Sequence, residues 1–442
     1  MARTTRGLPV PVPASLSNDT VIVNTATSSA IFRVVLLLIG CALVLYSWCA
    51  HRVYQSHQLS ARRDQASLQR AIQLQPKDAA NYDLLGQYFM WEVQDARAAA
   101  AQFQQAVHLN PYDSATWMHL AQAYNVLGAE SEQAQAIRNA IAVDPTTPEI
   151  AWNAANFFLI QGNTAEALDQ LGIVIRNDSG MAEAALDLGW RASGDVEAIE
   201  RRLPSDPAIY LNFIKVLIHR EQWAAASHAW ESLLAMNRDF DPRSALFYID
   251  VLLTKRDVAG AQNAWHQLVQ RSDVLKPYVR PGNLVVNTNF DCDMLNAGFD
   301  WHYSAIPNVS VMLDSTQSYQ ANQALLVTYF GVSADTGMRQ YVPVKPGAAY
   351  VVSAWVKSEE LRSANGPRLA VSDAYQNVEY AHSDETLGTT PWHEVQTAFT
   401  AGPDTNLVLL QFSRHPGDTR IQGRFCADAV RLSQRAGSSS EF

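Results

Sequence analysis

Prolines recur in the first half of the chain at a spacing that corresponds to one pair of helices. Pro76, Pro111 and Pro145 lie 35 and 34 residues apart. Residues 62–275 are otherwise rich in Ala, Gln, Leu and Glu, which favour helix. A period near 34 residues is typical of a solenoid of antiparallel helix pairs, in which each unit buries its apolar face only against its neighbours. The sequence therefore predicts a helical repeat domain over residues 62–275.

The residues at this period resemble the tetratricopeptide repeat. Small residues such as Gly86 and Ala121 are expected where two helices cross closely, because a larger side chain would hold the backbones apart. The first unit has one extra residue near its turn, and residues 181–203 match the repeat least. The matching positions in the two clearest units are Tyr82, Leu85, Gly86, Phe89, Ala99, Phe103, Ala106, Pro111, Trp117, Leu120, Ala121, Tyr124, Gly128, Ile137, Ala140 and Pro145.

This resemblance implies an α-solenoid that binds protein partners, with the first helix of each pair lining the concave face. Amide side chains on that face are suited to bind an extended peptide backbone. Ordinary solvated positions are the alternative interpretation of the same residues. The predicted partner groove consists of Asp83, Gln87, Met118, Gln122, Asn125, Trp152 and Asn156.

An uncharged apolar run precedes the repeats, from Val34 to Ala50. With its flanks it predicts one transmembrane helix over residues 31–53, because about 20 apolar residues span a bilayer core. Residues 1–30 are expected to be a flexible tail. Two alternatives stay open, namely lipidation at Cys41, which ends a lipobox-like run, and cleavage as a signal peptide. We expect a single-pass protein of the bacterial inner membrane with a periplasmic C-terminal body.

Beyond the junction at residues 271–283 the pattern changes to short runs rich in β-branched and aromatic residues, separated by Gly, Pro, Asn and Asp. About eight such runs predict a jelly-roll β-sandwich over residues 281–435. The motifs Asn283-Leu284-Val285 and Pro391-Trp392-His393 resemble those of carbohydrate-binding modules with the galactose-binding-like fold. The fold class is therefore multidomain α and β, and residues 436–442 are expected to be a flexible tail.

The resemblance to carbohydrate-binding modules implies that aromatic rings stack on sugars. Trp301, Trp355 and Trp392 are expected to pack in the core of the sandwich, which leaves three tyrosines as glycan-binding candidates. These candidates are Tyr303, Tyr329 and Tyr375. The resemblance also implies a structural calcium ion at Asp291 and Asp428, on the first and last strands, and no other cofactor is expected.

Cys292 and Cys426 lie on those same first and last strands, which are neighbours in the resembled fold. Cys292 shares parity with Phe290, and Cys426 shares parity with Val430, so both thiols are predicted to point into the core. A disulfide between them is therefore predicted, and it would require an oxidising compartment such as the periplasm. Two separate buried thiols are the alternative.

The composition and motifs exclude several classes of function. A net charge of −10 argues against a nucleic-acid partner. No nucleophile elbow, phosphate loop or zinc-ligand motif occurs, so we expect no catalytic residues and no enzyme. We expect a membrane-anchored scaffold that binds protein partners, linked to envelope or exopolysaccharide assembly. The alternatives are a glycan-binding protein with the repeats as a spacer, and a glycoside hydrolase. The acids considered for a hydrolase are Asp373, Glu379, Asp384 and Glu385.

Overall fold

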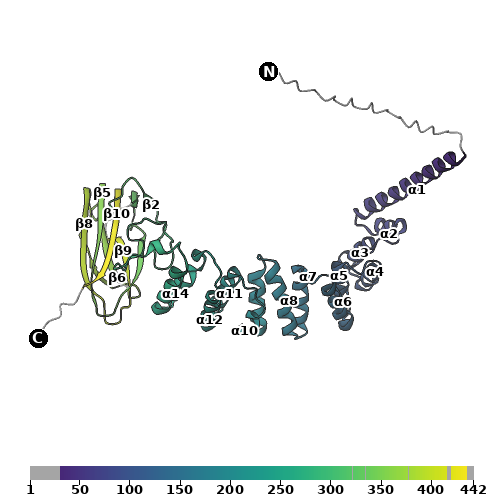
Figure 1. Cartoon of the computed structure of the whole chain (residues 1–442), viewed down its shortest axis with the longest axis horizontal. Helices are drawn as coiled ribbons and strands as arrows, with labels where there is room; N and C mark the ends of the chain where they lie inside the picture. Colours follow the sequence, from purple (N-terminus) through teal and green to yellow (C-terminus); the bar gives the residue numbers. More distant parts are fainter. Residues whose placement is uncertain (1–29, 321, 334, 377, 416–419, 436–442) are drawn as a thin grey trace, which may run out of the picture. The chain divides into compact units, whose positions relative to one another are not determined.

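A computed structural model of the chain describes residues 30–320, 322–333, 335–376, 378–415 and 420–435 (Figure 1). The chain forms two compact units, one ending at Asn177 and the other beginning at Asp178. The predicted tails at residues 1–30 and 436–442 lie outside the described residues, except for residue 30. The fold class predicted from the sequence is confirmed, since helices are followed by a β-sandwich.

Four helices of the first unit begin at an aspartate. Asp64, Asp78, Asp95 and Asp113 each occupy an N-cap, where the side-chain carboxylate accepts a hydrogen bond from a backbone N–H of the first turn. Two of the four caps, Asp78 and Asp113, follow shortly after a proline that ends the preceding helix. The helices are α1 (Ala30–Ser60), α2 (Gln65–Leu74), α3 (Ala79–Gln87), η1 (Tyr88–Val93), α4 (Ala96–Leu109), α5 (Ser114–Leu127), α6 (Glu130–Val143), α7 (Pro148–Ile160) and α8 (Thr164–Asn177).

Consecutive helices of this unit pack around a core built from alanines and a few large side chains. A Cβ atom at Gly86 would come within 2.6 Å of the Phe103 ring, so α3 and α4 cross where only glycine fits. Phe103 is fully buried as a result. The expectation of a close crossing at Gly86 is therefore confirmed.

The extra residue of the first unit is absorbed by a π-helix. Residues Tyr88–Val93 form η1, which ends at Gln94 with a left-handed backbone (φ 60°). A π-helix closes its hydrogen bonds over one more residue than an α-helix, so it takes up an insertion without breaking the helix. The repeat of 35 residues between Pro76 and Pro111 thereby keeps the helix-pair geometry of its neighbours.

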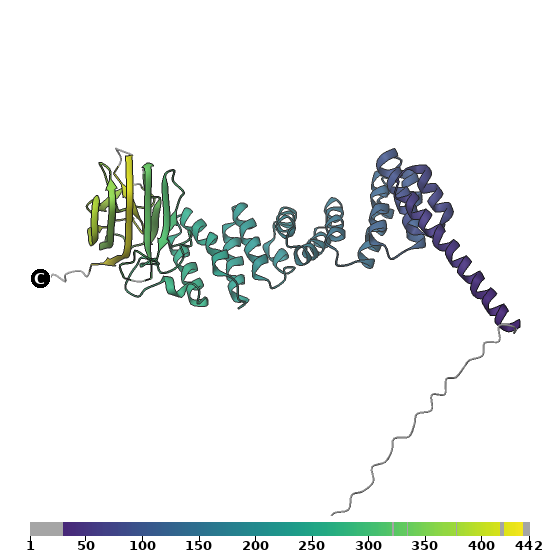
Figure 2. The same cartoon turned by 90° about the horizontal axis from the view of Figure 1, so that it is seen from above.

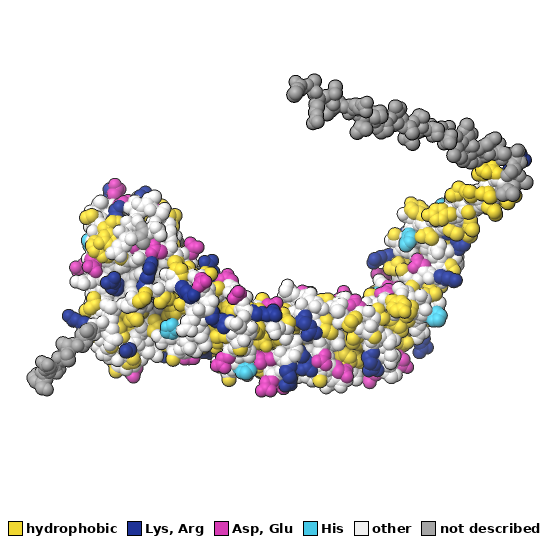
Figure 3. All heavy atoms as spheres, viewed as in Figure 1, with side chains coloured by type: hydrophobic (Ala, Val, Ile, Leu, Met, Phe, Trp, Pro, Cys, Tyr) yellow, Lys and Arg dark blue, Asp and Glu magenta, His cyan; other side chains and the backbone are white. Residues whose placement is uncertain are grey.

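The apolar run lies in α1, which is long and apolar enough to cross a membrane, a property that N-terminal signal sequences share. Hydrophobic side chains cover this helix in the view of Figure 3. The helix continues to Ser60, beyond the predicted end of the span at residue 53. Its last turns pack on the repeats, where Ser56 and Ser60 are hydrogen-bonded to the buried amide of Asn81. The apolar segment is therefore continuous with the first helix pair.

The second unit begins with further helix pairs. The pair in the poorly matching segment is irregular, as its weak pattern indicates, because α10 has only five residues. In the last pair Trp265 and Leu268 are buried. The helices are α9 (Ala182–Ser193), α10 (Val196–Glu200), α11 (Pro207–His219), α12 (Trp223–Ala235), η2 (Pro242–Ala245), α13 (Leu246–Thr254), α14 (Val258–Arg271) and η3 (Lys276–Tyr278).

The C-terminal strands form two antiparallel five-stranded sheets among the described residues (Figure 2). We call the sheet with the order β1-β4-β9-β6-β7 sheet A and that with the order β2-β3-β10-β5-β8 sheet B. The strands are β1 (His302–Tyr303), β2 (Val309–Asp314), β3 (Ala324–Val332), β4 (Met338–Pro343), β5 (Ala349–Arg362), β6 (Pro367–Asp373), β7 (Glu379–His382), β8 (Gly388–Thr400), β9 (Leu407–Arg414) and β10 (Arg420–Gln434).

The inner faces of the two sheets share one apolar core. Trp301 is fully buried there and stacks between Phe290 and Phe412, at centroid distances of 5.1 and 5.9 Å. The core position expected for Trp301 is therefore confirmed. The alternation of inward and outward side chains along each strand sends every second residue to the outer faces of the sandwich.

Direct contacts attach the last helix pair to the sandwich. The Asp250 carboxylate of α13 accepts a hydrogen bond of 2.7 Å from the backbone N–H of Gly298. The Trp265 ring of α14 meets the Phe299 ring edge to face at 6.1 Å. These contacts place α13 and α14 in the same compact unit as the sandwich, although the sequence pattern puts the domain boundary after residue 275.

Candidate functional site

The outer face of sheet A carries a row of side chains that crosses all of its strands. The strand register pairs His302 with Arg339, Arg339 with Gln411, Gln411 with Ala370, and Ala370 with His382. Their chain neighbours Met338, Phe412 and Leu369 lie in the core, so these five residues share the opposite face. Adjacent strands are about 4.8 Å apart, so the row extends for roughly 19 Å. We call these five residues the sheet A row.

Further polar groups lie beside the row. Arg368 is buried, and its guanidinium binds both carboxylate oxygens of Glu379 at 3.0 and 3.1 Å. Glu379 is also 2.7 Å from Nδ1 of His382, so one carboxylate holds two cationic or hydrogen-bonding side chains. On the other side of the row, Tyr341 is paired with Leu409 and is half-buried. The face therefore presents amide, guanidinium and imidazole groups next to an aromatic ring.

A pocket of about 480 Å³ opens at one end of this face. His302 and Tyr341 come from the sheet, and their rings meet edge to face at 5.4 Å. Burial raises the pKa of the Asp250 carboxyl, which lies in the opposite wall. The complete lining is Asp250, Leu253, Thr254, Arg256, His302, Tyr341, Ala374 and Tyr375.

The three tyrosines proposed as glycan contacts have different environments. Tyr375 lines the pocket just described and donates a hydrogen bond to the Leu253 carbonyl. Tyr303 is 41% exposed at the end of β1. Tyr329 is only 1% exposed, because its position on β3 faces the core, and a ring without an accessible face cannot stack on a sugar. The sequence prediction for Tyr329 is therefore wrong.

Two tryptophans assigned to the core lie outside it. Trp355 and Trp392 are half-buried on sheet B, and Tyr319 stacks on Trp355 at a centroid distance of 3.9 Å. The core prediction for Trp355 fails because Ala354 and Val356, its neighbours on β5, are the inward residues. The loop before β3 brings Tyr319 to this outer face, a contact for which the sequence carries no signal.

Cys292 and Cys426 are free thiols in the structure, so the predicted disulfide is wrong. A β-bulge between Asp428 and Arg431, with Ala429 at φ 48°, changes the parity of β10. Phe425 and Ala427 therefore point into the core, and Cys426 points to the outer side. Burial under the loop before β3 raises the pKa of the Cys426 thiol to about 11.

The two carboxylates proposed for calcium already accept hydrogen bonds from backbone donors. Asp428 accepts from the N–H groups of Tyr319, Gln320 and Ala429, and Asp291 accepts from that of Asn322. In the described part of the chain, no group of three or more acidic, His or Cys side chains is placed to hold a metal ion. Two carboxylates need further oxygen ligands to complete a calcium site, so the ion stays a prediction.

The partner groove predicted on the helices is only partly assembled. Asp83 is bound by the Gln87 amide at 2.6 Å and by His119 Nδ1 at 2.8 Å. Met118 is 6% exposed and belongs to the core, so its assignment to the groove is wrong.

The α5 face that meets α3 is therefore the one carrying His119, one residue further along the helix than the sequence indicated. Exposed Gln122 and Asn125 lie on α5, whereas half-buried Trp152 and Asn156 lie on α7. The side-chain N–H of Asn156 donates to the Trp152 carbonyl, and the amide oxygen of Asn156 is left for a ligand.

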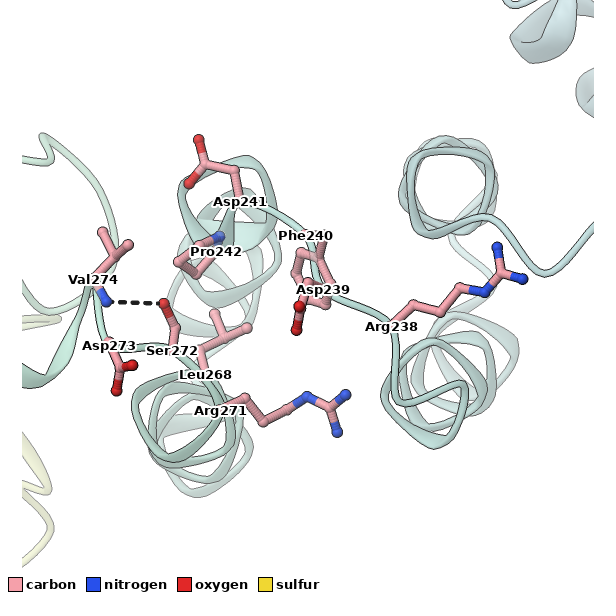
Figure 4. A pocket seen from close by; sticks show the side chains of 10 residues that line it. All are labelled: Arg238, Asp239, Phe240, Asp241, Pro242, Leu268, Arg271, Ser272, Asp273 and Val274. Carbon is pink, nitrogen blue, oxygen red and sulfur yellow. Dashed lines mark hydrogen bonds between the residues drawn. The ribbon is translucent and has the colours of Figure 1, made fainter. Parts of the chain in front are cut away.

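Another hollow, of about 370 Å³, lies between the α12–η2 loop and the end of α14 (Figure 4). Arg271, which is part of its lining, donates to the Leu234 carbonyl at 2.9 Å and to Asn237 at 3.5 Å. Arg271 thus joins α14 to the end of α12. The lining mixes arginines and aspartates without an aromatic platform other than Phe240.

Three of the four acids considered for a hydrolase have structural partners. Asp373 accepts from the Thr405 hydroxyl and from two backbone N–H groups of its own turn. Glu379 binds Arg368, and Glu385 accepts from the Gly366 N–H at 3.0 Å. These contacts give the carboxylates roles in the sandwich itself.

A family model described as carbohydrate binding domain matches residues 282–419. A comparison with curated proteins yields no match. Among solved structures, YrrB, a TPR protein with an unusual peptide-binding site, is 13% identical over 43% of this chain and 98% of its own, with a TM-score of 0.27.

A CBM4 structure is 16% identical, covering 34% of this chain and 99% of its own, with a TM-score of 0.27. TmCBM61 in complex with β-1,4-galactotriose is 21% identical, covering 35% of this chain and 99% of its own, with a TM-score of 0.26. The chain carries a tetratricopeptide-like helical repeat region and a C-terminal β-sandwich that matches the family of carbohydrate binding domains.

Proposed function

We propose that this chain is a membrane-anchored glycan-binding adaptor whose sugar site is the outer face of sheet A. The observation that carries the proposal is the sheet A row, in which planar polar groups lie on both sides of the small Ala370. Sugar recognition requires hydrogen-bonding groups held at fixed positions and a nearby ring for stacking. Gln411 at the centre of the row and Tyr341 beside it meet both requirements. The match to carbohydrate binding domains supports the same assignment.

The pairing of Arg368, Glu379 and His382 supports a preformed site. The Nη2 atom of Arg368 donates to both oxygens of Glu379, which also contacts His382, so these side chains lose less entropy when a ligand binds next to them. The outer face of sheet B is less suited, because exposed Met312, Phe330 and Val332 make part of it apolar. An extended polysaccharide that crosses the strands of sheet A is the ligand that this arrangement favours.

Binding to a panel of oligosaccharides tests the proposal. The purified chain, kept in detergent because of α1, is titrated with cellohexaose, xylohexaose, laminarihexaose and β-1,4-galactotriose in a calorimeter. We expect at least one to bind, and we expect Gln411→Ala to weaken that binding about tenfold.

Gln396→Ala is the matched control, because Gln396 is an exposed glutamine on β8, on the outer face of sheet B. The proposal is wrong if no oligosaccharide of the panel binds, or if Gln396→Ala and Gln411→Ala have the same effect.

The helical region is proposed to bind a protein segment at the cluster of Asp83, Gln87 and His119. Trp91, which is 49% exposed, lies next to His119 with its ring 5.5 Å away, so an apolar contact adjoins the polar ones. A π-helix at this position supports a functional role, since such insertions are frequent at binding sites. In cells that carry the Trp91→Ala variant, we expect the loss of a partner protein that cross-links to the wild-type chain. The Trp223→Ala variant is expected to keep that partner. Retention of every partner would remove this proposal.

Anchoring by α1 and export of the body complete the proposed function. The exposed apolar side chains between Val34 and Trp48 support a lipid-facing helix. A link to envelope or exopolysaccharide assembly follows from an anchored protein with sugar-binding and protein-binding parts. Carbonate extraction tests the membrane anchoring, and protease accessibility in spheroplasts tests the export of the sandwich. Release by carbonate, or full protection of the sandwich from external protease, would contradict it.

A further inference from the structure

The pocket at the end of sheet A has a wall that does not belong to the sandwich. Leu253 and Thr254 end α13, and Arg256 follows in the turn before α14. Across the pocket stand His302, which is the first residue of the sheet A row, and Tyr341, which lies beside the row. The helical region therefore contributes side chains to one end of the same face that is proposed to bind glycan.

This helical wall is held in place by hydrogen bonds. The Tyr375 hydroxyl donates to the Leu253 carbonyl at 2.8 Å, and the Asp250 carboxylate accepts from the Gly298 N–H at 2.7 Å. The Arg256 guanidinium lies 5.1 Å from the centre of the Tyr375 ring. A wall fixed at three points keeps its side chains in register with the sheet.

The chemistry of the pocket suits a single sugar residue. Its volume of about 480 Å³ is in the range of small-ligand sites. The rings of His302 and Tyr341 offer an aromatic surface, and a guanidinium brings several N–H donors in one plane for ring and side-chain hydroxyls. Arg256 stacks on Tyr375, and stacking on a ring face leaves the N–H edge of a guanidinium available to a ligand.

We propose that the last helix pair is part of the sugar site, that Arg256 contacts the terminal sugar of a bound chain, and that the glycan-binding face of sheet A is closed at this end. The protein then binds a polysaccharide by one of its ends and not along its interior. This inference rests on the proposed glycan site of sheet A, and it assigns a specificity role to a residue of the helical repeats.

The full-length chain in detergent tests the role of Arg256 with the oligosaccharide panel described above. Arg256 has a left-handed backbone (φ 65°), so Arg256→Asn is the substitution of choice, because asparagine tolerates that conformation. We expect it to weaken binding about tenfold. Lys255→Asn is the matched control, because the neighbouring Lys255 ammonium lies over the Trp223 ring, and neither residue lines the pocket.

The outcomes separate this inference from the proposed function. If Gln411→Ala weakens binding and Arg256→Asn does not, the glycan site stands and the helical contribution is wrong. If the wild-type chain binds no oligosaccharide, the proposed function itself fails. The Gly298 amide donates its hydrogen bond to Asp250, so hydrogen exchange at this amide detects a loosened helical wall. An Arg256→Asn variant that loses both binding and this protection is compared with Asp250→Ala, which removes the acceptor of the Gly298 N–H and keeps the guanidinium. Equal losses in both would overturn a direct contact.

Competition between short and long glycans tests the closed end. A hexasaccharide and its polymer are compared at equal mass of sugar. At equal mass the hexasaccharide supplies many more chain ends than the polymer. If the site binds chain ends, the hexasaccharide is therefore expected to compete far better. If the glycan-binding face is open at both ends, binding depends on the number of sugar residues and not on the number of chain ends. Equal competition per mass of sugar would therefore overturn end binding.

Discussion

The hydroxyl of Tyr375, on the turn after β6, donates a hydrogen bond of 2.8 Å to the backbone carbonyl of Leu253 near the end of α13. Two elements 122 residues apart in the sequence are joined by this bond. It lies at the edge of the pocket shared by sheet A and the last helix pair. A sandwich attached in this way does not hang freely from the repeats, and this attachment makes the shared pocket a fixed site.

Replacement of Tyr375 by phenylalanine removes this bond and keeps the ring. The expected cost is about 1 kcal/mol of local stability, the typical net contribution of one hydrogen bond. Hydrogen exchange by mass spectrometry should show faster exchange in α13 and in the β6–β7 turn, with the core strands unchanged. Tyr303→Phe is the control, since its ring is exposed at β1. Equal exchange in both variants would show that the bond does not hold the two parts together.

Gly86→Ala is expected to destabilise the first repeats by about 1 to 3 kcal/mol, because the new Cβ would lie 2.6 Å from the Phe103 ring. Gly128→Ala is the comparison, since its Cβ has open space but its backbone is left-handed (φ 68°), and strain alone costs about 1 kcal/mol. The urea midpoint of helix unfolding, followed by circular dichroism, measures both. Phe103→Leu combined with Gly86→Ala should recover part of the loss. If the losses of stability caused by Gly86→Ala and Phe103→Leu simply add in the double variant, the steric explanation is wrong.

The repeats could be predicted because their signal is local and periodic. Gly86 and Phe103 are a neighbouring pair in the repeat pattern, and their contact follows from the spacing alone. The extra residue before Pro111 was visible in the sequence, but its conversion into a π-helix depends on hydrogen bonds that no spacing encodes. The buried position of Met118 shows the same limit, since a rotation by one residue moves a side chain from a groove to the core.

The site on sheet A could not be predicted, because it depends on the register between strands distant in the sequence. His302, Gln411 and His382 come from three separate strands, and only their pairing places them in one row. Parity arguments fail wherever a bulge intervenes, as Cys426 shows. Aromatic residues attract attention in a sequence, whereas the central glutamine of this row does not.

The buried carboxyl of Asp300 predicts a stability of the sandwich that falls as the pH rises. Burial raises its pKa from 3.8 to about 7, and one of its oxygens has no hydrogen-bond partner in the described structure. Between these two values the folded state keeps a proton that the unfolded state has lost. The free energy of unfolding therefore decreases from pH 3.8 to about 7 and stays low above that range.

Asp300→Asn should remove this dependence and stabilise the sandwich at pH 8. The gain is at most about 4 kcal/mol, from ~1.4 kcal/mol for each unit of the pKa change. Urea unfolding at pH 5 and pH 8, followed by tryptophan fluorescence, measures it, with exposed Asp293→Asn as the control. If the free energy of unfolding of Asp300→Asn differs between pH 5 and pH 8 as much as that of the wild type, another group causes the pH dependence.

The thiols of Cys292 and Cys426 are expected to remain unlinked and to differ in reactivity. Cys426 is buried with its pKa raised to about 11, so little thiolate exists at pH 8, whereas Cys292 is partly exposed. Alkylation of the folded chain at pH 8 should modify Cys292 before Cys426, and urea should make both react. Cys292→Ser should leave Cys426 protected, because its protection comes from burial and not from a bond. A peptide map under non-reducing conditions that joins the two residues would contradict the bulge in β10, since the outward direction of Cys426 follows from it.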